Sequence, residues 1–307
     1  MASLIAHSGA LGDFITCLPA LHAWRLLHAT EPLILLGKPA FAALVPAPNF
    51  EEVWDIESAR SAPLFGAALR DTDPTQERLR AVTAALVFAL PSSPLLRLLT
   101  AAGVPEIVRQ DPFPPTRIHV VDYHLSLFPP GIAATAGRIP RIGLSVPAAV
   151  PRGTTALHPG SGSPAKNWPL ERFVALAAEM ERRGRRVVWI LGPAEEGLDL
   201  DPSAHLWKGV GLPTLAARLA LCDAYVGNDS GVTHLAAATG CPTVALFGGT
   251  DPDVWAPRGH AVACVQSRRK DMESIPVEKV VEALLSISRD EKKSGGTESF
   301  PQGELNR

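Results

Sequence analysis

The chain has 307 residues, of which 46% are hydrophobic and 20% are charged, so it can bury the core of one large domain or of two ordinary ones. Its formal net charge of −2 gives no electrostatic reason to expect nucleic-acid binding, which needs a basic face. The longest apolar runs, such as residues 84–90, are far shorter than the roughly 18 residues of a membrane-spanning helix, and the N-terminus lacks the basic segment of a signal peptide.

The first half of the chain alternates between apolar runs typical of strands and segments with helical spacing. It opens with a predicted strand at 3–7, a glycine-bearing turn at 8–13 and a helix at 14–28. The pattern then predicts strands at 33–36, 53–56 and 84–90 and helices at 39–45, 62–70 and 94–102. Residues 110–115 and 129–131 look irregular, and the Pro/Gly-bearing stretch 147–153 is interpreted as a linker.

The second half continues the same alternation. Strands are predicted at 156–158, 186–191, 224–226, 243–247 and 261–265, and helices at 169–183, 212–222, 232–239 and 276–288. The helix at 169–183 is amphipathic and is expected to end at Gly184. Its apolar positions repeat at helical spacing: Leu170, Phe173, Val174, Ala177 and Met180. The polar residues at the end of the chain are predicted to be disordered.

Alternating strands and helices with short connections favour parallel sheets covered by helices. We therefore predict an α/β protein with two doubly wound domains, residues 1–150 and 151–289, followed by a disordered tail, 290–307. In open α/β sheets the ligand binds at the carboxyl ends of the strands, which here face the cleft between the domains.

The cysteines form no recognisable metal-binding or redox motif. The four cysteines are widely spaced and form no CxxC pair: Cys17, Cys222, Cys241 and Cys264. This spacing argues against a zinc ribbon or redox motif and fits buried thiols in a reducing cytoplasm.

The strongest local signal is the stretch from 223 to 255. A buried strand runs into GNDSG at 227–231 and then into a short Ala-rich helix ended by Gly240, and a second Gly-rich loop follows the strand at 243–247. Unpaired N–H groups and the helix dipole at such a turn attract phosphate. The alternative is a pair of ordinary turns between βαβ units.

A second loop, 158–169, has the groups that bind a diphosphate. Its two glycines free the backbone, Ser161 and Ser163 offer hydroxyls, and Lys166 supplies one mobile cation. The spacing is not that of the GxxxxGK[ST] nucleotide loop. The alternative is a solvated Gly/Ser turn with a surface lysine.

Other polar residues allow two interpretations each. Asp13 is either a functional carboxylate or a first-turn cap that complements the helix dipole. His234 is either a ligand contact or a core histidine, and Glu195 with Glu196 either accept from ribose hydroxyls or are simply solvated. Asp229 and His234 have no further ligands at metal spacing, so we expect no bound metal.

Together these motifs resemble glycosyltransferase family 9, the ADP-heptose:lipopolysaccharide heptosyltransferase family. The resemblance covers most of the chain outside roughly 40–140 and the tail, with the motifs in the family's order and spacing. They are HSGALGD at 7–13, LPAL at 18–21, HPG at 158–160, KNWP at 166–169, LGPAE at 191–195, GNDSG at 227–231, HLAAA at 234–238 and FGGTDP at 247–252.

The resemblance implies a GT-B fold, in which two Rossmann-like domains face each other across a cleft, and an inverting, metal-independent transfer. The acceptor would bind the N-terminal half, at Gly12, with Asp13 as general base. The nucleotide-sugar would bind the C-terminal half. In that half the resemblance assigns the diphosphate to Ser161, Ser163 and Lys166, the ribose to Glu195 or Glu196, and the donor sugar and phosphates to Asp229, Ser230, Gly231 and His234.

The leading hypothesis is therefore a cytoplasmic enzyme that moves a sugar, heptose from ADP-heptose, onto a lipopolysaccharide-type or other cell-envelope glycan. Its partners would be the nucleotide-sugar, a glycolipid or glycan acceptor and, peripherally, the inner face of the inner membrane, with no cofactor and no nucleic acid. Only scattered arginines occur between residues 40 and 140, so the sequence does not identify the acceptor. Two alternatives stay open: a nucleotide-sugar epimerase on the same fold, and a non-catalytic nucleotide-sugar-binding protein.

Overall fold

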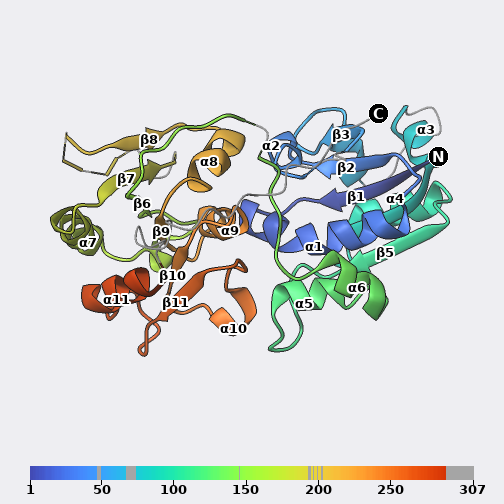
Figure 1. Ribbon diagram of the computed structural model, residues 1–307. Coiled ribbons are helices and arrows are strands. Elements are labelled where there is room, and N and C mark those ends of the chain that lie inside the picture. The colour runs from blue at the N-terminus through green and yellow to red at the C-terminus, as the bar shows by residue number, and fades with distance from the viewer. Residues whose placement is uncertain are drawn as a thin grey trace.

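Two parallel sheets organise the molecule and lie side by side (Figure 1). The computed structural model describes residues 1–46, 50–66, 74–144, 146–192, 195, 197–198, 200–201 and 203–287. The predicted pair of doubly wound parallel-sheet halves is confirmed. The predicted boundary at residue 150 falls in the connection between the last helix of the first half and the first strand of the second. The predicted tail, 290–307, lies outside the described residues.

The first sheet has the strand order β3-β2-β1-β4-β5. Its strands are β1 (Ala2–His7), β2 (Leu33–Gly37), β3 (Glu52–Asp55), β4 (Val82–Phe88) and β5 (Glu106–Gln110). The helices of this half are α1 (Leu11–Leu27), α2 (Pro39–Ala42), α3 (Pro74–Arg80), α4 (Pro94–Ala101), α5 (Val120–Leu125) and α6 (Pro130–Ala136), with a 3₁₀ turn at Ala62–Phe65.

The second sheet has the order β11-β10-β9-β6-β7-β8. Its strands are β6 (Thr154–His158), β7 (Arg186–Leu191), β8 (Leu206–Lys208), β9 (Ala224–Asn228), β10 (Thr243–Phe247) and β11 (Val262–Gln266). The helices are α7 (Leu170–Arg182), α8 (Leu212–Leu219), α9 (Gly231–Ala238), α10 (Pro252–Trp255) and α11 (Val277–Ile287), with a 3₁₀ turn at Pro164–Lys166.

Both sheets are covered on their two faces, so the central strands β1, β6 and β9 are buried at every position and mostly apolar. In β1, Ile5 packs with α1, whereas Leu4 points to the opposite face, where α3 and α4 pack. In the second half α7 and α11 cover one face and α8 and α9 the other. No described helix is long and apolar enough to cross a membrane.

The departures from the sequence prediction lie at sheet edges and in short helices. The edge strands β5 and β8 were not predicted, because edge strands carry polar residues and lack the apolar run of a central strand. The short helices α3, α5 and α10 were also missed. Helix α6 starts at Pro130, within the stretch predicted to be irregular, because proline suits the first turn of a helix.

Two predicted helices are shorter than expected. Helix α2 ends at Ala42 rather than 45, and the backbone continues in i→i−3 turns. The predicted helix 62–70 is a 3₁₀ turn at Ala62–Phe65, and residues 67–70 lie outside the described part of the chain.

Two burial predictions were wrong. Val174 in α7 is 46% exposed, and Leu176 faces the core in its place. Cys264 is exposed on the edge strand β11, whereas the other three cysteines are buried as predicted.

The two halves pack directly on each other through α1 and α9. One hydrophobic cluster runs from α1 of the first half into α8 and α9 of the second. The segment that follows α6 passes α1 on its way to β6 (Figure 1). Strands β1 and β9 lead directly into α1 and α9, so the carboxyl ends of these two strands face the packed interface between the halves.

Candidate active site

The two predicted phosphate loops lie at the same edge of the second sheet. Strands β6 and β9 are hydrogen-bonded neighbours, with His158 beside Gly227 in the register. Because both strands run parallel, the loop that follows β6 and the loop that follows β9 leave the sheet together. The pairing of β6 with β9 therefore places the two loops next to each other.

Lys166 and Asp229 join the two loops. Lys166 Nζ lies 2.7 Å from Asp229 Oδ2, and the two side chains are 43% and 10% exposed. The ammonium group is thus accessible from solvent, and an incoming phosphate could replace the carboxylate as its partner.

The two predicted serines have different surroundings. Ser161 Oγ lies 2.7 Å from the carbonyl oxygen of Ser163 and 2.6 Å from Asn167 Oδ1, and it accepts from the Ser163 N–H at 3.2 Å. Ser161 therefore shapes the loop from inside. The half-buried Ser163 hydroxyl makes no hydrogen bond to a described residue, so it is the better placed of the two to contact a ligand.

Asn228 is a structural residue of the site that lies outside the predicted set. Its side chain is fully buried; Nδ2 donates to the Pro159 carbonyl at 2.7 Å, and Oδ1 accepts from the Trp168 N–H at 3.0 Å. It thus clamps both ends of the Lys166 loop. A polar amide at the last position of a buried strand was the available signal, since such a group must be paired.

Glu195 is buried, contrary to the solvated alternative. Its carboxylate accepts from the Gly192 N–H at 2.7 Å and packs so closely on Gly160 that a side chain there would overlap with it. His158 Nε2 lies 4.0 Å from Glu195 Oε2. Burial lowers the pKa of His158 to about 4, so its ring is neutral at neutral pH and this contact is not an ion pair. Glu196 lies outside the described residues.

The N-terminus of α9 contains the remaining predicted donor-site residues. Ser230 is the N-cap, and its hydroxyl accepts from the Thr233 N–H. His234 is 6% exposed, and burial lowers its pKa to about 4 while the Asp229 carboxylate acts in the opposite direction. A neutral imidazole and a positive helix end are thus placed beside Lys166.

Gly231 brings this helix end against the first half of the chain. A Cβ on Gly231 would lie 2.8 Å from Leu11 Cβ and 3.0 Å from Gly12 N, and one on Gly12 would lie 3.3 Å from His234 Cδ2. The N-terminal turns of α1 and α9 are therefore in contact, and both present positive dipole ends to the same region.

Asp13 lies in the first turn of α1, one residue after this contact. Its side chain is exposed, and Oδ2 accepts from the Ala10 N–H at 3.0 Å. The capping interaction weighed in the sequence is therefore present. One carboxylate oxygen makes the cap, and exposure leaves the group accessible from solvent.

A second contact between the halves engages the Asp-Pro-Asp sequence that follows β10. Arg117 Nε donates to Asp251 Oδ2 at 2.6 Å, and Arg117 Nη2 lies 2.5 Å from Asp253 Oδ2. Nearby, the Ala256 carbonyl oxygen lies 3.0 Å from His119 Nε2. Among the described residues no group of three or more His, Cys, Asp or Glu side chains is arranged to hold a metal ion.

Comparisons of the sequence with protein families and with known proteins point to the same family. Residues 133–284 match the model of glycosyltransferase family 9 (heptosyltransferase). Lipopolysaccharide heptosyltransferase 2 of Salmonella typhimurium is 32% identical over 115 residues, which cover 34% of this chain and 33% of that protein. Lipooligosaccharide heptosyltransferase 2 of Campylobacter jejuni serotype O:6 is 24% identical over 159 residues, 43% of this chain and 50% of that protein. The match thus spans between a third and half of the length of these relatives.

Solved structures extend the likeness in fold to nearly the whole chain. A family 9 glycosyl transferase from Veillonella parvula superposes with a TM-score of 0.77 at 17% identity, over 93% of this chain and 96% of its own. The E. coli ADP-heptose lps heptosyltransferase II gives 0.71 at 20% identity, over 94% and 98%. These values support the two-domain arrangement of the fold.

Proposed function

Since the chain belongs to glycosyltransferase family 9, we propose that it transfers a sugar from a nucleotide-sugar to a glycan acceptor, with donor and acceptor bound on opposite sides of the α1–α9 contact. The observation that carries the proposal is this contact, because Asp13 follows Gly12 on one side of it, while Asp229, the partner of Lys166, shortly precedes Gly231 on the other. ADP-heptose is the proposed donor, since the name of a fold relative specifies that nucleotide-sugar. The acceptor is a lipopolysaccharide-type glycan, reached at the cytoplasmic face of a membrane.

The diphosphate of the donor binds between the Lys166 loop and the N-terminus of α9. Lys166 exchanges Asp229 for a phosphate oxygen, while the Ser163 and Ser230 hydroxyls and the N–H groups of the first turn of α9 offer further donors. Glu195 holds the loops beneath Gly160 and Gly192 in place, within reach of the ribose.

Asp13 acts as general base in a single inverting displacement. The acceptor hydroxyl attacks the anomeric carbon from the side opposite the diphosphate, the bond to the diphosphate oxygen breaks, and Asp13 takes the hydroxyl proton. The proton moves late, because the hydroxyl becomes acidic only as its oxygen bonds to carbon. Negative charge that develops on the leaving diphosphate is stabilised by Lys166 and the dipole of α9, which replace a divalent metal in this proposal.

Incubation of the purified protein with ADP-heptose and a heptose-deficient lipopolysaccharide core tests the proposal. We expect ADP release that depends on the acceptor, a gain of one heptose in the acceptor by mass spectrometry, and an inverted anomeric configuration by NMR. An altered donor sugar without transfer would identify an epimerase instead. A thermal shift with neither product would identify a binding protein.

A further inference from the structure

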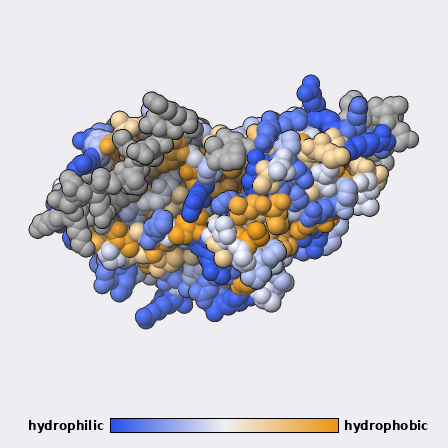
Figure 2. All heavy atoms as spheres, turned by 45° about the vertical axis from the view of Figure 1, so that its right-hand side comes forward, coloured by the Kyte–Doolittle hydropathy of each residue, from blue (hydrophilic) through white to orange (hydrophobic). Residues whose placement is uncertain are grey.

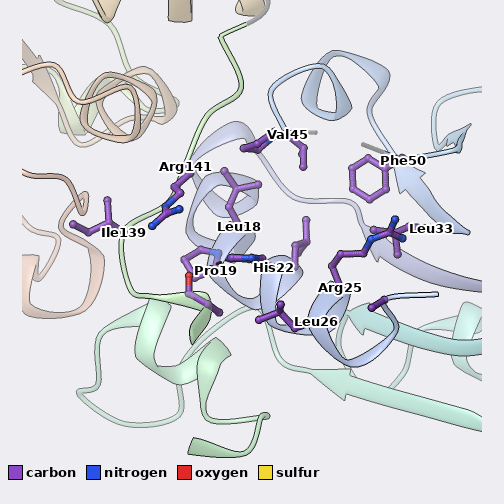
Figure 3. Close-up of a pocket in the computed structure, with 14 residues that line it drawn as sticks. Leu18, Pro19, His22, Arg25, Leu26, Leu33, Val45, Phe50, Ile139 and Arg141 are labelled. Atoms are coloured by element: carbon purple, nitrogen blue, oxygen red, sulfur yellow. Dashed lines mark hydrogen bonds between the residues drawn. The ribbon is translucent and has the colours of Figure 1, made fainter. Parts of the chain in front are cut away.

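A cavity of about 460 Å³ lies along the flank of α1, away from its N-terminal turn (Figure 3). Leu18 and Leu26 of α1 lie on one side, and Val45 and Phe50 approach from the segment before β3. Leu21 of α1 also lines the cavity. The residues that line it include none of those assigned to the candidate active site. The cavity is therefore a separate feature of the N-terminal half.

The walls of this cavity are continuous with the hydrophobic core. Leu18 and Leu21 are buried, whereas Leu26, Val45 and Phe50 are only half-buried and pack against the same cluster. Hydrophobic side chains also gather in patches across the middle of the face shown in Figure 2, with hydrophilic ones around its rim. An open, apolar cavity of this size is favourable for the burial of an alkyl chain.

Two arginines line the cavity. They are Arg25 and Arg141, and no Asp or Glu is among the lining residues. Arg25 is already engaged, since Nη1 donates to the Glu31 carbonyl at 2.8 Å and Nη2 to Glu51 Oε1 at 3.4 Å.

Arg141 differs from Arg25. It follows helix α6, borders the cavity beside Ile139, is exposed, and makes no hydrogen bond or ion pair with a described residue. A cation without a partner at the margin of an apolar cavity complements an acidic head group on an apolar chain.

We propose that this cavity binds an anionic amphiphile, with an unbranched alkyl chain between α1 and Phe50 and an acidic head group at Arg141. The volume lies in the range of roughly 300–1,000 Å³ that is usual for small-molecule sites. The site is independent of the proposed transfer reaction, because it uses neither Asp13 nor the donor loops.

Isothermal titration calorimetry of the full chain with sodium octanoate, decanoate and dodecanoate, each kept below its micelle concentration, tests the proposal. We expect one saturable site per chain, and affinity should rise by up to about fourfold per methylene until the cavity is filled. Dodecyltrimethylammonium, which has the same chain with a cationic head, should bind at least tenfold more weakly than dodecanoate.

Matched variants locate the site. Arg141→Glu should weaken dodecanoate binding at least tenfold, whereas Arg152→Glu, an equal charge change at an exposed position of the same connection outside the cavity, should leave it unchanged. Val45→Trp should fill the cavity and remove binding, and Arg141→Glu still decides the matter if that variant fails to fold. Absence of saturable binding, or equal loss in Arg141→Glu and Arg152→Glu, would overturn the proposal.

Discussion

Gly231 approaches the backbone of Gly12 so closely that a methyl group on Gly231 would lie 3.0 Å from the Gly12 nitrogen. Gly12 lies in the first turn of α1 and Gly231 is the first residue of α9, and the two helices belong to different halves of the chain. The absence of two side chains is therefore what allows the first turn of α1, which carries Asp13, to pack against the first turn of α9.

Gly231→Ala should force α1 and α9 apart, because the atoms that the new methyl meets are the Gly12 backbone and Leu11 Cβ at 2.8 Å. We expect a loss of about 1–3 kcal/mol in the free energy of unfolding. Turnover should fall by roughly 10²-fold, since small displacements between reacting groups are that costly. Gly131→Ala is the control, because no heavy atom lies within 4 Å of its new methyl. Wild-type turnover in Gly231→Ala would show that the close contact between α1 and α9 is not needed for catalysis.

Asp13→Asn should lower turnover by roughly 10²–10⁴-fold, because the amide cannot accept the proton of the acceptor hydroxyl. The amide oxygen can still accept from the Ala10 N–H, so the melting temperature and donor affinity should barely change. Steady-state rates with both substrates saturating give the measurement, with Glu171→Gln, a first-turn carboxylate of α7, as the control. Activity within a fewfold of wild type would leave Asp13 as a cap alone.

Lys166→Ala should weaken ADP binding by tenfold or more, which corresponds to the loss of one charge-assisted contact of about 1.5–3 kcal/mol. The melting temperature should also fall, because the Asp229 carboxylate, which is 10% exposed, loses its ion-pair partner. Calorimetry with ADP decides this, and Lys279→Ala, which removes an exposed lysine paired with Glu282, is the control. Equal ADP affinity in wild type and Lys166→Ala would remove the lysine from the donor site.

Turnover should persist in EDTA, because Lys166 and the α9 dipole offset the charge of the leaving diphosphate. The Asp251 and Asp253 carboxylates of the Asp-Pro-Asp sequence are paired with Arg117 in the structure. Rates are to be compared before and after chelation and after addition of Mg²⁺ or Mn²⁺. Activity that is lost with EDTA and restored by either ion would contradict the metal-free mechanism.

Stability should fall as the pH drops from about 6.5 to 4. Burial lowers the pKa of His7, His124, His158 and His234 to about 4, below the ordinary value of 6.5. Across this interval the unfolded chain takes up protons that the folded chain does not, so protonation favours unfolding; above pH 6.5 the contribution is constant. Urea unfolding at several pH values should show a shallower pH slope for His124→Phe than for wild type. His205→Asn, at an exposed position, should keep the wild-type slope.

Periodicity and turn chemistry in the sequence were enough to predict the two parallel sheets, because central strands buried on both faces are mostly apolar and the helices between them carry one apolar stripe. They also placed Lys166 and Asp229 in loops that follow strands of the second half, whereas the structure showed that these strands, β6 and β9, are neighbours. Edge strands such as β5 were missed because an edge tolerates polar residues and so leaves no pattern.

Only the tertiary structure showed which of the candidate residues are buried and which segments they contact. Glu195 is buried under Gly160 rather than solvated, and Asn228 clamps the Lys166 loop, because both depend on contacts between segments distant in sequence. The contact of Gly12 with Gly231 likewise depends on how two separate sheets pack, and spacing along the chain does not encode the distance between two folded surfaces.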